Sequence, residues 1–161
     1  MPGRPEVTVA AIAERDGRFL IIEERANGRL VLNQPAGHVE DRETLLEAVV
    51  REAREESAWC FAPAHLLGLY LWRNARTGRS TLRVAFVGDV SGHDPHAPLD
   101  RGIVGTHWMS REELARAPTR LRSPLVLRCI DDHLAGQRLP LESVADLGLD
   151  VAGQLRAVNV G

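Results

Sequence analysis

Three glutamates at positions 52, 55 and 56 have the spacing i, i+3 and i+4. On an α-helix this spacing places the three carboxylates on one face. Like charges at i,i+4 destabilise a helix by roughly 0.2–0.5 kcal/mol per pair. A bound divalent cation reverses this effect, and carboxylate oxygens suit Mg²⁺ or Mn²⁺. The alternative is a solvated acidic helix face, and the spacing of Glu52, Glu55 and Glu56 alone does not decide between the two.

The segment that contains these glutamates has the pattern of an amphipathic helix. Thr44 and Glu47 have the spacing of a capping box, which predicts a helix that starts here. At about 100° per residue, an apolar stripe lies beside the acidic one. The stripe consists of Leu46, Val49, Val50, Ala53 and Ser57. We therefore expect the apolar stripe to pack on a core and the glutamates to border a cleft.

Gly37 lies before the helix and follows Gln34, Pro35 and Ala36. This order predicts a tight loop that leads directly onto the helix. Glycine there permits backbone conformations closed to other residues, and it allows a backbone carbonyl to approach a metal.

The combined pattern resembles the signature of the Nudix hydrolases. It reads Gly37, five residues, Glu43, seven residues, and then Arg51-Glu52-Ala53-Arg54-Glu55-Glu56. Two later positions depart from the family pattern, with Ala58 in place of a glycine and Trp59 in place of an aliphatic residue. The first departure concerns the usual glycine stop of the helix rather than the chemistry.

The resemblance implies roles for these residues. Glu52, Glu55 and Glu56 are implied as ligands of Mg²⁺, or alternatively Mn²⁺, with the carbonyl of Ala36 as a further oxygen. Glu43 and Arg51 are implied to form an ion pair that fixes the loop to the helix around the metal. Bridging divalent ions neutralise a phosphoanhydride, position a water and lower its pKa. One carboxylate then accepts the proton of this water, and we expect Glu52 to be that base.

Residues outside the signature are candidates for substrate binding. Many Nudix enzymes add an acid from a distal loop, and here the candidate is Asp100, with Asp94 second; a solvated turn aspartate is the alternative. Arg83 lies in an apolar strand and is a candidate phosphate ligand, or it faces solvent. Trp72 is a candidate for stacking on a ring, or it packs in the core. His38 follows Gly37 and is a candidate phosphate contact, or it is an ordinary loop histidine.

Two further acids, Glu23 and Glu24, end a predicted strand. One of them could face the site, although two exposed acids are the simpler interpretation.

The remaining pattern predicts an α/β protein with the Nudix fold, in which a mixed β-sheet is sandwiched between α-helices. Strands are expected at residues 7–13, 19–22, 30–32, 66–72, 82–90 and 106–109. Turns are expected at Asp16-Gly17, Asn27-Gly28 and Gly78. Residues 91–102 are expected to form a loop. Ser110 caps one predicted helix, and Ser123-Pro124 starts another, with Ser123 as N-cap and Pro124 at the first helical position.

Length and composition agree with one globular domain over residues 1–161, with a core at 7–142 and a C-terminal tail at 143–161. The chain has 161 residues, of which 44% are hydrophobic and 26% charged. A net charge of −2 gives no electrostatic reason to expect nucleic acid as a bulk partner. All basic residues are arginine, which excludes catalysis by lysine and supplies guanidinium groups suited to phosphate.

Other classes are also disfavoured by the sequence. The N-terminus lacks a long apolar run, so we expect neither a signal peptide nor a membrane span. Cys60 and Cys129 match no metal or redox spacing and are interpreted as reduced thiols in a cytoplasmic protein. The expected partner is a small phosphoanhydride, and the expected assembly is a monomer or a homodimer.

Three further segments, at residues 33–38, 121–126 and 136–142, resemble a subgroup of Nudix phosphatases. This resemblance extends over residues 7–142. It implies release of orthophosphate from nucleoside tri- and diphosphates, and from the thiamine-pathway diphosphates hydroxymethylpyrimidine pyrophosphate and thiamine pyrophosphate. Two alternatives remain open. One is a pyrophosphohydrolase of the ADP-ribose type, and the other is a non-catalytic module that senses a nucleotide.

Overall fold

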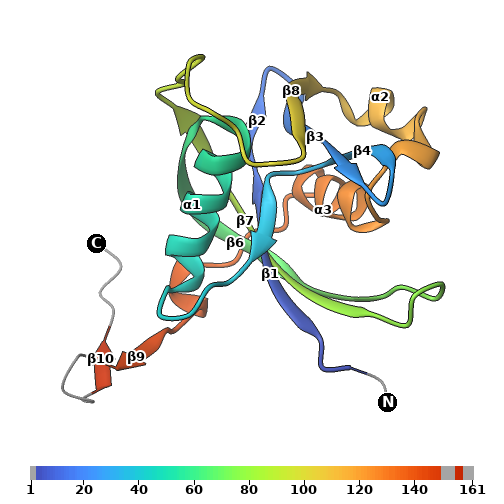
Figure 1. The fold of residues 1–161 in the computed structure, drawn as a ribbon. Coiled ribbons are helices and arrows are strands. Elements are labelled where there is room, and N and C mark those ends of the chain that lie inside the picture. Colours follow the sequence, from blue (N-terminus) through green and yellow to red (C-terminus); the bar gives the residue numbers. More distant parts are fainter. Residues whose placement is uncertain (1–2, 150–154, 158–161) are drawn as a thin grey trace.

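The computed structural model describes residues 3–149 and 155–157, and its fold is drawn in Figure 1. Two four-stranded sheets form its centre. The first sheet has the order β5 (Ala36–His38), β1 (Glu6–Ile12), β7 (Ser80–Ser91) and β6 (Cys60–Arg73). The second contains β2 (Glu14–Arg15), β3 (Arg18–Ala26), β4 (Arg29–Asn33) and β8 (Ile103–Met109). The helices of the described residues are α1 (Leu45–Ser57), α2 (Arg111–Ala115) and α3 (Leu125–Leu134).

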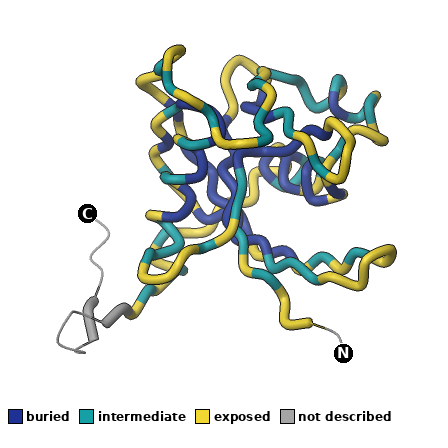
Figure 2. The backbone as a smooth tube through the Cα atoms, viewed as in Figure 1, coloured by how far each residue is buried: buried dark blue, intermediate teal, exposed yellow. Residues whose placement is uncertain are grey.

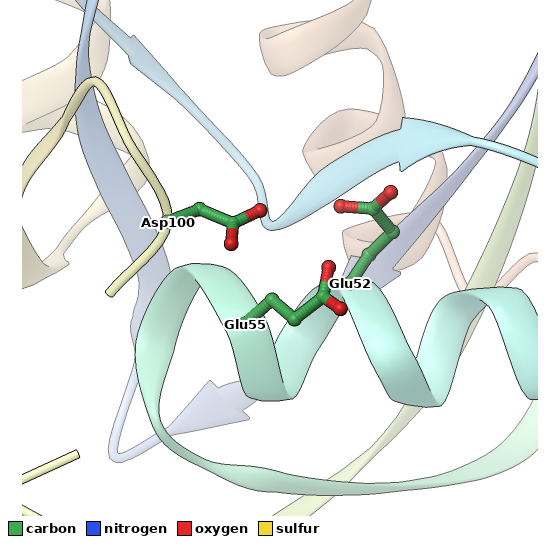
Figure 3. A group of neighbouring side chains, drawn as sticks. All are labelled: Glu52, Glu55 and Asp100. Carbon is green, nitrogen blue, oxygen red and sulfur yellow. The ribbon is translucent and has the colours of Figure 1, made fainter. Parts of the chain in front are cut away.

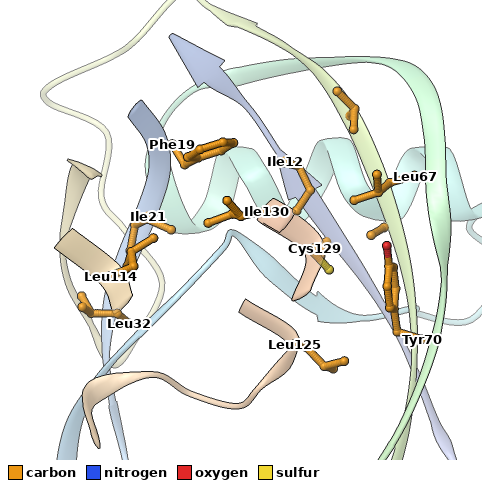
Figure 4. Packing of buried hydrophobic residues seen from close by; sticks show 13 residues of the cluster. Ile12, Phe19, Ile21, Leu32, Leu67, Tyr70, Leu114, Leu125, Cys129 and Ile130 are labelled. Carbon is orange, nitrogen blue, oxygen red and sulfur yellow. The ribbon is translucent and has the colours of Figure 1, made fainter. Parts of the chain in front are cut away.

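The first sheet is mixed, because β1 pairs parallel with β7 while β5 and β6 pair antiparallel with their neighbours. Its side chains alternate between two packed faces. On one face Val9 and Phe86 pack with Val49 and Ala53 of α1. The other face carries Ala10, Ile12, Ala85 and Val87, which belong to one buried cluster with Cys129 and Ile130 of α3, as Figure 4 shows for part of the set. The sequence prediction of an α/β fold with a mixed sheet between helices is therefore confirmed.

The second sheet is antiparallel and adds Phe19, Ile21 and Leu32 to the cluster beneath α3. Its two tight turns are those expected from sequence. Asp16 and Gly17 have φ of 51° and 73°, and Asn27 and Gly28 have φ of 51° and 75°. Positive φ at both central residues matches the twist of the flanking strands in a two-residue hairpin.

Several element boundaries differ from the prediction. The strand predicted at residues 66–72 begins at Cys60, because bulges near Pro63 and Leu66 let it continue along β7. The last long helix begins at Leu125, so Pro124 rather than Ser123 occupies the N-cap position. Ser123 still contributes, because its Oγ accepts a hydrogen bond from the Leu125 N–H at 3.2 Å.

The buried residues lie mainly where the two sheets meet α1 and α3. The far end of the β6–β7 hairpin is more exposed (Figure 2). After α3 the chain forms the 3₁₀ turn η2 (Leu141–Ser143). The short strand β9 (Leu147–Leu149) follows and pairs antiparallel with β10 (Leu155–Ala157). The rest of the segment expected to be a tail lies outside the described residues.

In the part of the chain that the structure describes, every helix is too short or too polar to cross a membrane.

Candidate metal centre

Helix α1 starts and ends at points set by its own sequence. Thr44 Oγ1 accepts from the Glu47 N–H at 3.1 Å, and a Glu47 carboxylate oxygen accepts from the Thr44 N–H at 2.8 Å, which completes the expected capping box. At the other end Ala58 has φ of 60° and its N–H bonds to Arg54 O at 2.9 Å. The helix therefore stops where a glycine was expected, although alanine in this conformation costs roughly 1–2 kcal/mol.

The buried face of α1 differs from the expected stripe. Its buried residues are Ala48, Val49, Glu52, Ala53, Glu56 and Ser57. Val50 is 39% exposed, so its predicted place in the core is wrong. The helix is rotated so that two glutamates, rather than Val50, complete the face turned toward the protein.

Three carboxyl groups meet at one end of this face. Oxygen atoms of Glu52, Glu55 and Asp100 lie within 4.8 Å of one another. Figure 3 shows Glu52 and Glu55 rising from α1 while Asp100 reaches toward them from the loop. Three hard oxygen donors from separate side chains are the type of ligand that Mg²⁺ prefers. Of the two candidate distal acids, Asp100 lies in this group and Asp94 lies outside it.

The loop that carries Asp100 is attached to the last turns of α1. The Asp100 N–H donates to Glu55 O at 2.9 Å, and the Asp94 N–H donates to Ala58 O at 3.1 Å. These bonds satisfy helix carbonyls that have no partner within the helix. The loop thus holds Asp100 beside Glu55 through backbone contacts.

Glu56 has a different environment from the other two glutamates. It is buried, and its Oε2 accepts a hydrogen bond from the Ala36 N–H at 3.1 Å. Burial raises the pKa of Glu56 to about 9. Burial also raises the pKa of Glu52, and the contact with Arg51 opposes that shift. Ala36 therefore contacts Glu56 through its N–H rather than its carbonyl. Glu56 lies outside the group of three carboxyl groups.

Arg51 connects the acidic group to the loop before the helix. Its Nη1 donates to Glu52 at 2.9 Å and to Glu55 at 3.0 Å. Its Nε and Nη2 donate to the two oxygens of Glu43 at 2.9 and 2.6 Å, and Nη2 also donates to His38 O at 3.0 Å. The expected Glu43–Arg51 ion pair is present, and it lowers the pKa of Glu43. The guanidinium group holds the loop and the helix together from one side of the carboxylates.

Gly37 leaves space for a carboxyl group of the helix. A Cβ atom at this position would overlap the carboxyl group of Glu52. The backbone of Gly37 lies outside the positive-φ region, so the expectation of a conformation reserved for glycine is wrong. The absent side chain instead makes room for the carboxylate.

These groups line a cavity of about 540 Å³. Seven carboxyl groups and four arginines border it, so the wall carries an excess of negative charge. A cavity of this kind repels an anionic substrate unless cations are bound in it. The charge and the oxygen donors therefore both fit a divalent metal beside Glu52, Glu55 and Asp100.

The candidate substrate-binding residues also reach this cavity. Arg83 is buried with 4% of its surface exposed, so the interpretation of a solvent-facing strand residue is wrong. Trp72 is half-buried and combines both of its expected environments, because it lines the cavity and packs against the core. His38 is exposed, and its Nε2 lies 3.2 Å from a carboxylate oxygen of Glu6.

Three further residues of the wall, Asn33, Arg122 and Thr8, carry no signal of a site role in the sequence. Of the acids Glu23 and Glu24, one of which could face the site, Glu24 lines the cavity in an ion pair with Arg122 at 3.2 Å. Glu23 instead pairs with Arg120 away from this cavity. These residues lie far apart along the chain, and only the fold of the two sheets brings them together.

Known proteins resemble this chain in sequence and in fold. The family model for the NUDIX domain matches residues 3–128. Phosphatase NudJ of Shigella boydii is 41% identical over 143 residues, which cover 89% of this chain and 92% of that protein, and the Escherichia coli K12 protein of the same name gives the same values. A solved NUDIX hydrolase from Nitrosomonas europaea superposes with a TM-score of 0.84 at 43% identity, covering 88% of this chain and 96% of that one.

Proposed function

This chain belongs to the Nudix family and is a Nudix hydrolase, and from that premise we propose that it is a metal-dependent phosphatase that releases orthophosphate from phosphoanhydrides. The proposed substrates are nucleoside tri- and diphosphates, together with hydroxymethylpyrimidine pyrophosphate and thiamine pyrophosphate. The observation that carries the proposal is the group formed by Glu52, Glu55 and Asp100 at the wall of the cavity. Similarity to phosphatase NudJ supports the choice of terminal rather than internal attack.

Mg²⁺, or alternatively Mn²⁺, is the proposed cofactor. Glu52, Glu55 and Asp100 would hold it, with Glu56 and Ala36 as the further ligands proposed from the family pattern. A bound divalent metal neutralises phosphate charge and lowers the pKa of a water molecule. Hard oxygen donors and the negative cavity wall support this choice over a metal that prefers nitrogen or sulfur.

The other residues of the signature position these acids. Arg51 ties Glu52 and Glu55 to Glu43 and to the His38 carbonyl, which fixes the helix relative to the loop. Gly37 leaves space for the Glu52 carboxyl group. We propose Glu52 as the base that accepts a proton from the attacking water. Its place in the group with Glu55 and Asp100 supports this role, because a general base must lie within hydrogen-bond reach of the attacking water.

The test is phosphate release by the purified protein with Mg²⁺ and with EDTA. We expect orthophosphate from ATP, ADP and thiamine pyrophosphate in Mg²⁺ and none in EDTA. Product analysis then separates the alternatives, because terminal attack yields orthophosphate and one shortened product. Internal attack on ADP-ribose yields two phosphorylated organic products. No Mg²⁺-dependent release from any of these substrates would favour the non-catalytic module.

We also propose a reducing, cytoplasmic environment. Cys60 is exposed and Cys129 is buried, and both are free thiols. An exposed free thiol persists where the surroundings are reducing.

A further inference from the structure

Arg83 differs from the other arginines of the cavity in its partners. Arg51 pairs with Glu43, Arg79 with Glu6 at 3.1 Å, and Arg122 with Glu24 at 3.2 Å. Arg83 instead donates from Nη1 to the side-chain oxygen of Gln34 at 2.9 Å and from Nη2 to that of Asn33 at 3.1 Å. Among the described residues no carboxylate lies within 4.0 Å of its guanidinium group. Arg83 is therefore the one of these four arginines whose partners are neutral.

A buried cation with neutral partners is costly. The effective desolvation penalty of a buried ion is several kcal/mol, and neutral amides offset only part of it. Burial accordingly lowers the pKa of Arg83. The guanidinium group lies at the wall of the cavity, where a bound anion would supply a charged partner.

The Nε of Arg83 is buried without a hydrogen-bond partner, and so is a second polar atom beside it. Thr8 is paired with Arg83 across β1 and β7, and its buried Oγ1 has no hydrogen-bond partner. Both residues line the cavity. Buried polar groups are usually satisfied, so these two neighbours indicate that a polar ligand group completes this part of the wall.

The sheet register relates this position to the acidic group. On β1, Thr8 is paired with His38 of β5, which follows Gly37. Arg83 is thus two strands from β5, or about 10 Å at the usual strand spacing. The Arg83 side chain contacts Asn33 and Gln34, which lie just before β5 in the chain. A ligand with two linked phosphoryl groups can approach both the carboxylate group and Arg83.

We propose that Arg83 binds the second phosphoryl group of the anhydride, the one next to the group that is attacked. This inference rests on the proposed function and assigns a specificity-determining residue to it. The proposed substrates differ in their organic parts and share this second phosphoryl group. A fixed cation at the wall of the cavity suits that shared feature, and it favours anhydrides over monoesters.

The sharpest test introduces a carboxylate beside Arg83 by a single substitution. Asn33→Asp changes one atom of the side chain that Arg83 already contacts, so the shape is kept. Asn74→Asp is the matched control, because Asn74 lines the same cavity and its Oδ1 accepts from the Arg76 and Thr77 N–H groups. Both variants add one negative charge to the cavity, and only the first adds it beside Arg83.

The affinity of each variant for two ligands is measured by calorimetry in the presence of Mg²⁺. One ligand is methylenediphosphonate, which has two phosphoryl groups, and the other is orthophosphate, which has one. We expect Asn33→Asp to weaken diphosphonate binding at least about tenfold, which corresponds to one charge-assisted hydrogen bond. The affinity of this variant for orthophosphate should stay within about twofold of wild type. The affinities of Asn74→Asp for both ligands should stay within the same range. Without ligand or metal, Asn33→Asp should raise the melting temperature.

Three outcomes would overturn the assignment. Equal weakening by Asn33→Asp and Asn74→Asp would mean that only the overall charge of the cavity matters. An equal loss of affinity for both ligands in Asn33→Asp would place Arg83 at the attacked phosphoryl group. Unchanged diphosphonate binding in Asn33→Asp would remove Arg83 from the site. Wild-type phosphate release with Mg²⁺ is measured in parallel, so that failure of this inference is distinguished from failure of the proposed function.

Discussion

Gly37 lies directly against the carboxyl group of Glu52, so that the loop before α1 and the acidic face of the helix are in contact. A side chain at residue 37 must displace that carboxylate or move β5. The first movement changes the position of Glu52 relative to Glu55 and Asp100, and the second shifts the Ala36 N–H that donates to Glu56. The contact therefore explains why a glycine in the loop before the helix belongs to the same site as the helical carboxylates.

Gly37→Ala should lower kcat about 100-fold, the size of effect expected from a displacement of about 1 Å at a catalytic group. Gly105→Ala is the control, because a Cβ there meets no atom within 4 Å. Steady-state kinetics and thermal unfolding of both variants test this. Equal activity of the two variants would show that the contact with Glu52 has no catalytic consequence.

Asp100→Asn should lower kcat at least about tenfold, because it removes one anionic oxygen donor from a metal site. Asp94→Asn is the control, because Asp94 belongs to the same loop and lies outside the group of three carboxyl groups. Its Oδ1 accepts from the His96 N–H at 3.0 Å, and its Oδ2 lies 4.0 Å from Arg54. This variant should keep activity close to wild type. A Mg²⁺ titration of activity checks the origin of the loss, since a lost ligand raises the concentration required. A larger effect of Asp94→Asn than of Asp100→Asn would contradict the assignment.

Glu56 makes the stability of the metal-free protein depend on pH. Its pKa is raised from 4.5 to about 9 in the folded protein, so between these values the folded state holds a proton that the unfolded state has released. Stability in EDTA should therefore fall as pH rises through this window. Glu56→Gln should remove most of that slope, and each kcal/mol recovered raises Tm by roughly 2–4 °C in a chain of this size.

The control for this pH effect is Glu112→Gln, at an exposed position on α2. It should leave the pH dependence of Tm as in wild type. Parallel curves for Glu56→Gln and wild type from pH 5 to 9 would show that Glu56 is ionised in the folded, metal-free protein.

Arg51 is the cation between Glu52 and Glu55 when no metal is present. Arg51→Gln should lower the stability in EDTA by roughly 1.5–3 kcal/mol, the range for hydrogen bonds to charged groups. The loss should be smaller in Mg²⁺, because a bound cation also separates these carboxylates. Arg54→Gln, on the same helix and 4.0 Å from Asp94, should change Tm equally in both conditions. Denaturant unfolding with and without Mg²⁺ measures the difference, and equal losses for Arg51→Gln would contradict this role.

Local signals in the sequence were sufficient for much of the fold. The Thr44–Glu47 capping box and the Asp16-Gly17 and Asn27-Gly28 turns depend on residues a few positions apart, and each forms as expected. The length of β6 was not predictable in this way. Its extension to Cys60 depends on pairing with β7 across two bulges, which only the assembled sheet determines.

The site also combines features that local sequence predicts with features that depend on the assembled fold. The spacing of Glu52, Glu55 and Glu56 placed all three on one helix face, yet their environments differ through contacts made by other elements. Glu56 is buried against the Ala36 N–H, whereas Glu55 joins a group completed by Asp100. The arginine that lacks a carboxylate partner, Arg83, is identified only after the neighbours of every arginine in the cavity are known.

The most direct test of the central claim is the Mg²⁺ dependence of orthophosphate release by wild type and Glu55→Gln. This change removes one anionic oxygen donor at nearly constant shape from a side chain that is 40% exposed. We predict a fall in kcat of about 100-fold or more, consistent with the several kcal/mol that a metal supplies. Unfolding in EDTA should be unchanged or shifted to higher temperature. Activity within a few-fold of wild type at every Mg²⁺ concentration would contradict the assignment of this carboxylate group as a catalytic metal site.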